Sequence, residues 1–430
     1  MHSKTNKSFL IAAPWSNSGK TLLTLGLSRY YKKQGYRIQN FKCGPDYIDT
    51  IHHTNASGNT SVNLDSIMMS DSHLQEVYER HSSQAEITIV EGVMGLFDGA
   101  KKDKGSTAEI AKKLGLPIIL VVNAKAMAHT VAALLHGLKT FDPDIQIAGV
   151  VFNFVKTASH YTFLKEACES VDLKALGYIT PHEALNIPSR HLGLHIDQSF
   201  EETIEKAANH VAHIGKTIIE QLDDYPIKPI KKRIQKEKGA LKIAIAKDDA
   251  FRFTYAENLH YLRQLGQLTF FSPMRDKKLP PSDIIYLAGG YPELHLAQLS
   301  KNKEMITAIT KAAEAGTKII AECGGMMYLG KSIIDEEGKD HPMVGVFDFS
   351  TSMENKKLHL GYRKVHLNDQ EVWGHEFHYS SVLDDEQYPS IAQVYTARNR
   401  VSPTKIYRYN NVMASYIHLY WGENGRSLFQ

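Results

Sequence analysis

A cysteine followed by two glycines is the feature of this sequence with the clearest chemical use. The apolar run Lys318-Ile-Ile-Ala-Glu is typical of a buried parallel strand and leads directly to Cys323, after which Gly324 and Gly325 begin a helical pattern. A thiol between a strand and a helix N-terminus meets unpaired N–H groups and the helix dipole, which lower a thiol pKa and can bind an oxyanion. A lone cysteine is most often a packing residue, but packing does not require two following glycines. We therefore predict that Cys323 is a nucleophile.

A thiol nucleophile needs an oxyanion hole as well as a base. Gly289 and Gly290 follow another strand-like run, and their amides could stabilise a tetrahedral oxyanion. An ordinary tight turn also fits this pair, and without the thiol it would be the preferred interpretation.

The base is harder to choose because the chain has 21 histidines. A late strand-like run, residues 412–420, would present His418 near its end, whereas His375 and His378 flank Glu376. A single histidine on a strand is usually structural, so the residues alone rank these candidates weakly. We expect no metal site at His375 and His378, because no further ligand cluster is evident.

A second pattern, near the N-terminus, is typical of phosphate binding. The short apolar run Ser8-Phe-Leu-Ile-Ala-Ala-Pro precedes a small-residue loop and an amphipathic helical pattern over residues 22–33. In such a loop the backbone N–H groups contact phosphates, a lysine neutralises β/γ charge and a threonine hydroxyl binds Mg²⁺. Ala13 stands where a longer loop of the dethiobiotin synthetase type has its first glycine. The predicted ATP-binding residues are Ser16, Asn17, Ser18, Gly19, Lys20 and Thr21.

Acidic residues follow the next strand-like runs, where open parallel sheets place their ligands. Asp46 and Asp49 follow residues 37–42, Glu91 ends the run of residues 86–91, and Asp98 lies in the loop after it. We predict that Glu91, on a glycine-rich turn, holds Mg²⁺ directly or through water beside the loop threonine. Any single acid could instead be a solvated charge or a helix cap, and Asp98 could serve only its turn.

Strand-like and helical patterns alternate in both halves of the chain, which predicts parallel sheets covered on both faces. We expect an α/β ATP-binding domain over residues 1–196 and a second α/β domain over residues 240–430. Residues 197–239 are charged, mostly helical in pattern and basic at their end, which favours a solvated linker.

Composition excludes several classes of protein. A chain of 430 residues is too long for one ordinary core, and 43% hydrophobic with 23% charged residues is typical of soluble globular proteins. A net charge of +3 gives no argument for a nucleic acid or membrane partner. Three cysteines suit a reducing cytoplasm, no apolar run reaches the length of a membrane span, and the polar start is no signal peptide.

Several long motifs in one order resemble the cobyrinate a,c-diamide synthase family, glutamine-dependent amidoligases of corrin biosynthesis. The resemblance covers nearly the whole chain. Its motifs are Ser18-Gly-Lys-Thr, Phe41-Lys-Cys-Gly-Pro-Asp-Tyr-Ile-Asp, Asn63-Leu-Asp-Ser, Glu91-Gly-Val-Met-Gly-Leu-Phe-Asp-Gly, Gly289-Gly-Tyr-Pro-Glu, Glu322-Cys-Gly-Gly-Met-Met-Tyr-Leu and Ser415-Tyr-Ile-His-Leu. It implies a P-loop, dethiobiotin-synthetase-like domain followed by a class I glutamine amidotransferase domain.

The resemblance also implies roles for individual residues. His418 would raise the nucleophilicity of Cys323, without the acidic third residue of the usual class I triad. This chain departs from the family at Asn17, where glycine is usual, at Cys43, where an aliphatic residue is usual, and at Tyr420, where a second histidine is common. The predicted metal ligands are Thr21, Asp46 and Glu91, and the predicted substrate residues are Lys42, Tyr47 and Asp98.

The implied function is ATP- and glutamine-dependent amidation of the a and c carboxylates of cobyrinate through acyl phosphates, in cobalamin biosynthesis. Mg²⁺ would be the cofactor, with ATP and L-glutamine as co-substrates, and a homodimer is compatible with this function. Hydrogenobyrinate or nickel-sirohydrochlorin are alternative tetrapyrrole substrates for the same chemistry. A partner-switching P-loop ATPase of the chromosome-partitioning type is an alternative of another class, but it does not explain Cys323 or the second domain.

Overall fold

The computed structural model describes residues 5–182, 185, 198–226, 239–367, 370–423 and 425. It divides into two compact units, Met1–Lys232 and Arg233–Gln430, which we describe separately. None of the helices in these described ranges is both long and apolar enough to cross a lipid bilayer.

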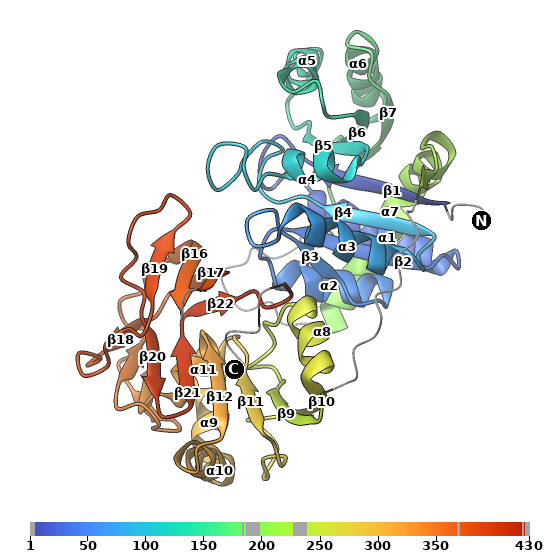
Figure 1. The fold of residues 1–430 in the computed structure, drawn as a ribbon. Helices are drawn as coiled ribbons and strands as arrows, with labels where there is room; N and C mark the ends of the chain where they lie inside the picture. The colour runs from blue at the N-terminus through green and yellow to red at the C-terminus, as the bar shows by residue number, and fades with distance from the viewer. Residues whose placement is uncertain are drawn as a thin grey trace. The chain divides into compact units, whose positions relative to one another are not determined.

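A parallel sheet forms the centre of the N-terminal unit (Figure 1), with strand order β3-β2-β4-β1-β5-β6-β7 and β8 antiparallel to β1. Its strands are β1 (Thr5–Ala12), β2 (Ile38–Cys43), β3 (Val62–Leu64), β4 (Ile87–Glu91), β5 (Ile118–Asn123), β6 (Ile147–Asn153), β7 (Ala175–Ile179) and β8 (Tyr225–Pro226). The helices between and after them are α1 (Lys20–Lys33), α2 (Ile48–Ser57), α3 (Asp71–Ser82), α4 (Thr107–Leu114), α5 (Val131–Phe141), α6 (Ala158–Glu169) and α7 (Gln198–Gln221). The expected parallel α/β fold is thus confirmed for this unit.

Helix α7 packs on α1 within the N-terminal unit, although the sequence analysis assigned its residues to a linker (Figure 1). Val211, Ile214 and Ile218 are fully buried in the same core as Leu23 of α1. Ionic contacts from Arg29 of α1 to Glu201 and Glu205 add to this interface. The charged composition of α7 therefore reflects a one-sided apolar helix rather than a solvated connection, and the basic end of the predicted linker, residues 227–238, lies outside the described residues.

The C-terminal unit is built around a mainly parallel sheet with strand order β10-β9-β11-β12-β21-β20. Its strands are β9 (Leu241–Ala246), β10 (Gly266–Phe271), β11 (Ile284–Leu287), β12 (Lys318–Glu322), β20 (Ile406–Tyr409) and β21 (Val412–Ser415). The helices are α8 (Ala256–Leu265), the 3₁₀ turn η2 (Pro292–Leu294), α9 (Leu296–Lys301), α10 (Lys303–Glu314) and α11 (Gly324–Leu329).

Smaller sheets, which the sequence analysis did not predict, complete the described part of this unit. One has the order β19-β16-β17-β22 and the other the order β14-β13-β15-β18. Their strands are β13 (Ser332–Ile334), β14 (Asp340–Pro342), β15 (Ser350–Ser352), β16 (His359–Leu367), β17 (Gln370–His378), β18 (Ser381–Leu383), β19 (Gln393–Thr396) and β22 (Ile417–Leu419).

The predicted late strand over residues 412–420 is wrong as a single strand, because the chain changes sheet at Tyr416. Before it, β21 runs parallel to β12, with Ser415 opposite Glu322. After it, β22 pairs with β17, with His418 opposite His375. This change of sheet carries His418 onto a different layer from the strand that precedes Cys323.

Candidate active sites

Cys323 occupies a tight turn between β12 and α11, with φ 47° and ψ −108°. A positive φ is uncommon for a residue with a side chain and costs free energy, so the surrounding contacts must hold it. Its N–H donates to the carbonyl of Ser415 at 2.7 Å, and its carbonyl accepts from the N–H of Met327 at 3.0 Å. A methyl group on Gly325 would lie 2.2 Å from the carbonyl oxygen of Leu287, which explains why glycine follows the thiol.

The loop of Gly289 and Gly290 borders the side chain of His418 and the turn that holds Cys323. A methyl group on Gly289 would lie 2.0 Å from Cε1 of His418, so only glycine leaves room for the imidazole. On the other side, a methyl group on Gly324 would lie 3.1 Å from the backbone nitrogen of Gly290, which puts that amide beside the turn of Cys323. The structure therefore brings the glycine loop against both the imidazole and the turn of Cys323, and it gives Gly289 a second role that the sequence did not indicate.

Glu322, which was not among the predicted site residues, is a buried carboxyl group. It accepts hydrogen bonds from the Tyr286 hydroxyl at 2.7 Å and from the N–H of Leu419 at 3.0 Å. Burial raises the pKa of Glu322 to about 8, so the neutral acid is its state at neutral pH. An acid at the end of a buried strand, directly before the predicted nucleophile, was the signal that could have drawn attention to it.

Burial sets the protonation of the predicted catalytic pair. It raises the pKa of the Cys323 thiol well above its usual value, and Glu293 adds to the effect, while the N–H of Gly324 opposes it. Burial also lowers the pKa of His418 to about 3, with the charges of His375 and His378 acting in the same direction. The expected lowering of the thiol pKa by the helix N-terminus is thus outweighed by desolvation, and the thiol and the imidazole are both neutral.

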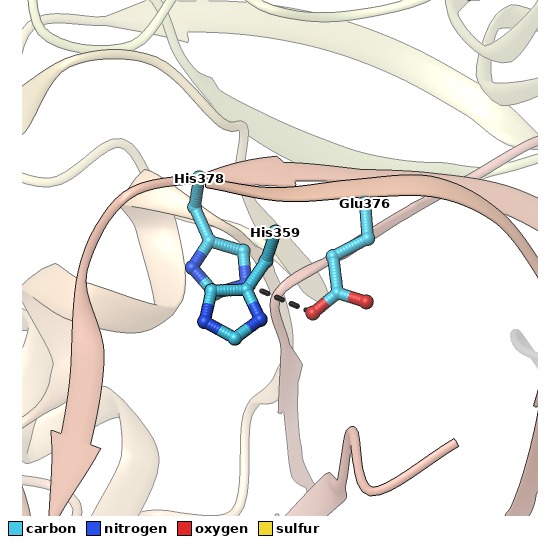
Figure 2. A group of neighbouring side chains, drawn as sticks. All are labelled: His359, Glu376 and His378. Atoms are coloured by element: carbon cyan, nitrogen blue, oxygen red, sulfur yellow. Dashed lines mark hydrogen bonds and ion pairs between the residues drawn. The ribbon is translucent and has the colours of Figure 1, made fainter. Parts of the chain in front are cut away.

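The other candidate bases, His375 and His378, have different surroundings in the structure. Figure 2 shows the rings of His359 and His378 lying over one another, with centroids 4.8 Å apart, and the carboxylate of Glu376 beside His378. One ligand atom from each of these three residues lies within 4.8 Å of the others, so the chain does assemble a potential metal-binding group here. The expectation that His378 has no ligand cluster was therefore wrong, and His375 is not a member of it.

The donor atoms of His378 and Glu376 are engaged in hydrogen bonds and ion pairs with protein atoms. His378 directs Nδ1 to the carbonyl of Ser380 and Nε2 to Oε1 of Glu376, both at 2.8 Å. Glu376 also pairs with Nε of Arg363 at 2.5 Å and accepts from the Thr404 hydroxyl at 2.9 Å. Burial opposes ionisation, yet His378 and Arg363 hold the pKa of Glu376 at about 2. These contacts make His378, Glu376 and Arg363 an ionic network.

The predicted phosphate loop has the expected place between β1 and α1. Asn17 has φ 63° and Gly19 has φ 109°. Asparagine tolerates this left-handed conformation better than most residues, which explains how it replaces the usual glycine. Asn153, at the carboxyl end of β6 and not predicted as a site residue, donates from Nδ2 to the carbonyl of Ser18 at 3.0 Å and holds the loop.

The acid predicted to bind metal, Glu91, lies at the centre of a buried network. It accepts from the Thr21 hydroxyl at 2.7 Å, from Nζ of Lys42 at 2.9 Å and contacts Nε2 of His53 at 2.6 Å. Lys42 also pairs with Asp49 at 2.5 Å. Burial opposes ionisation of Glu91, but Lys42 and His53 hold its pKa well below the usual range. The predicted proximity of Thr21 and Glu91 is confirmed, whereas His53 was missed because nothing in its helical context marks it.

The remaining predicted residues have structural contacts that do not test their roles. Asp46 Oδ1 accepts from the N–H groups of Ile48 and Asp49 at 3.0 Å and so caps α2. Asp98 Oδ2 accepts from the N–H of Gly95 at 3.0 Å, the turn contact weighed above. Lys20 donates to the carbonyl of Met94 at 2.6 Å, on the same glycine-rich loop. Lys42 is almost fully buried, and Tyr47 is partly exposed at the start of α2.

Comparisons with known proteins agree with the division of the chain into an N-terminal and a C-terminal unit. Residues 9–194 match a family model of the CobQ/CobB/MinD/ParA nucleotide binding domain, and residues 242–425 match a CobB/CobQ-like glutamine amidotransferase domain. The chain is 38% identical to a cobyrinate a,c-diamide synthase of Caldanaerobacter subterraneus, over 96% of this chain and 94% of the relative. It is 39% identical to the enzyme of that name from Leptospira interrogans, over 96% and 95%. It is also 38% identical to a hydrogenobyrinate a,c-diamide synthase of Brucella anthropi, over 96% and 98%.

Proposed function

The chain belongs to the cobyrinate a,c-diamide synthase family, and we propose that it uses glutamine and ATP to amidate the a and c carboxylates of cobyrinate in cobalamin biosynthesis. The observation that carries this proposal is the glycine loop that borders both His418 and the turn of Cys323, in a chain that also has the predicted phosphate loop. Glutamine hydrolysis needs the first arrangement, and acyl phosphate formation needs the second.

In the proposed glutaminase step, the Cys323 sulfur attacks the side-chain amide carbon of glutamine. His418 accepts the thiol proton and returns it to the leaving nitrogen, so ammonia departs and a thioester remains. The amide of Gly290 supports the developing oxyanion. Water then attacks the thioester, which releases glutamate and restores the thiol. Because the free thiol and the imidazole are both neutral, proton transfer has to accompany the attack.

In the proposed ligase step, a carboxylate oxygen of the tetrapyrrole attacks the γ-phosphorus of ATP, and ADP leaves. Ammonia attacks the resulting acyl phosphate, phosphate leaves, and loss of a proton gives the amide. Lys20 would turn from Met94 to the β/γ-phosphates, a movement that a long side chain accommodates.

The donor set beside the phosphate loop fits magnesium. The Thr21 hydroxyl and Oε1 of Glu91 lie 2.7 Å apart, and hard oxygen ligands are those that Mg²⁺ prefers. Thr21 and Glu91 would hold the ion, with Asp46 as the third proposed ligand. Magnesium, when bound, supplies charge neutralisation on the triphosphate.

A single assay tests the proposal and separates its alternatives. Purified protein is incubated with ATP, Mg²⁺ and L-glutamine, and with cobyrinate, hydrogenobyrinate or nickel-sirohydrochlorin in separate reactions, and products are analysed by mass spectrometry. We expect two amidations of cobyrinate. Amidation of another tetrapyrrole alone would reassign the substrate, and ATP hydrolysis without any glutaminase activity would support the partner-switching ATPase. A cytoplasmic location, a homodimer and the absence of a nucleic acid partner remain parts of the proposal.

A further inference from the structure

Glu293 lies directly beside the predicted glutaminase site. It is the middle residue of η2, which follows the glycine loop of Gly289 and Gly290. The preceding residue, Pro292, packs on the turn of the nucleophile, because a methyl group on Gly324 would lie 2.7 Å from its Cδ. The side chain of Glu293 is close enough to Cys323 and to Tyr416 for its charge to act on both.

One carboxylate oxygen of Glu293 is buried and has no hydrogen-bond partner within the described parts of the chain. Burial raises the pKa of Glu293 to about 7, and the nearby cation Lys356 already pairs with Glu336. A buried acceptor without a donor is costly and uncommon in a folded protein. Its persistence beside a nucleophile points to a donor that arrives with a ligand.

We propose that Glu293 binds the α-ammonium group of the glutamine substrate. This inference rests on the proposed glutaminase function and adds a specificity-determining residue to it. Glutamine offers two kinds of donor, the α-ammonium group and the side-chain amide. The ammonium group matches Glu293 better, because a full cation offsets the desolvation of a carboxylate and forms a charge-assisted hydrogen bond. The amide nitrogen must also leave during the reaction, so holding it with a carboxylate would oppose its departure.

The test compares two substrates in two enzymes. L-Glutamine and glutaramate, which lacks the α-amino group, are hydrolysed by the wild type and by Glu293→Gln in the full chain, and kcat/KM is measured from glutamate or glutarate release. We expect the substitution to lower kcat/KM for L-glutamine on the order of 100-fold, the loss typical of removing one partner of a buried charge pair. The value for glutaramate should change by less than about 3-fold, because that substrate has no cation to lose.

A matched control is Glu336→Gln, since this neighbouring carboxylate is 65% exposed. It should leave the preference for L-glutamine unchanged, and ammonia-driven amidation should be unchanged in both variants, which shows that the chain is folded. If Glu293→Gln lowers kcat/KM by the same factor for both substrates, or leaves both values unchanged, the inference is overturned while the proposed function stands. If the wild type hydrolyses neither substrate, the proposed function and this inference fall together.

Discussion

The backbone N–H of Leu419 donates a 3.0 Å hydrogen bond to Oε1 of Glu322. Glu322 immediately precedes the predicted nucleophile Cys323, and Leu419 immediately follows the predicted base His418. The two strands belong to different sheets, so no ladder hydrogen bonds join them directly. One side-chain carboxyl group therefore links the segment of the predicted nucleophile directly to that of the predicted base.

The first prediction concerns the stability of this link. Glu322 has a pKa of about 8 in the folded protein, against about 4.3 in an unfolded chain, because burial penalises its charged form. Between these values the folded state keeps a proton that the unfolded state releases. Stability should therefore fall as pH rises, by up to about 1.4 kcal/mol per pH unit from this group. Glu322→Gln, which resembles the neutral acid, should remove that part of the slope in urea unfolding between pH 5.5 and 7.5. If the unfolding free energy of Glu322→Gln falls with pH as steeply as that of the wild type, Glu322 does not have a raised pKa in the folded protein.

The second prediction concerns the space beside the imidazole. Gly289→Ala should displace His418, because the added methyl would lie 2.0 Å from Cε1. A displacement of about 1 Å in a catalytic group can lower turnover by roughly 100-fold, and we expect at least that loss in glutaminase kcat. Gly137→Ala is the matched control, since nothing lies within 4 Å of a methyl group there. Normal glutaminase activity in Gly289→Ala would show that the imidazole position does not matter.

The third prediction separates the two chemistries. Cys323→Ser should lower glutamine-driven amidation by at least about 10³-fold, because the hydroxyl is a far weaker nucleophile beside a neutral imidazole. Amidation with ammonium salts should stay close to the wild-type rate, since the ligase residues belong to the N-terminal unit. Mass spectrometry of the amidated product measures both. Loss of both activities in a folded variant would refute the two-site scheme.

The fourth prediction concerns the choice of base. His418→Asn should slow glutaminase turnover by about 10²- to 10⁴-fold and slow alkylation of Cys323 by iodoacetamide, while ammonia-driven amidation persists. His378→Asn should chiefly lower thermal stability, because it leaves the buried carboxylate of Glu376 without one of its partners. The reverse result, with thiol reactivity lost only in His378→Asn, would reassign the base.

The fifth prediction concerns the phosphate loop. Lys20→Ala should depress amidation on the order of 100-fold with either glutamine or ammonia, because charge on the transferring phosphoryl group is no longer offset. Glutamine hydrolysis without ATP should be unaffected. Glu91→Gln is a poorer test, since it would also leave the buried Lys42 without part of its ionic environment. Wild-type ammonia-dependent rates in folded Lys20→Ala would exclude the loop from catalysis.

The sequence predicted the features that depend on local pattern. The strands that lead to the phosphate loop, to Glu91 and to Cys323 are continuous apolar runs, and each is a buried strand in the structure. The sheet of β16 and β17 was not predicted, because polar and charged residues do not alternate regularly with apolar ones along these two strands. The pKa of Cys323 was misjudged for a related reason, since desolvation depends on surrounding layers that no local pattern reports.

The fit between Gly289 and His418 also constrains how this sequence can change over generations. While the imidazole is present, every residue type other than glycine at position 289 would place its Cβ 2.0 Å from Cε1 of that ring. Once His418 is replaced by a small residue, that barrier disappears and the loop is free to vary. Substitution at position 289 should therefore follow substitution at position 418 in any lineage that abandons the reaction, and an intact glycine beside an altered residue 418 would mark a recent loss.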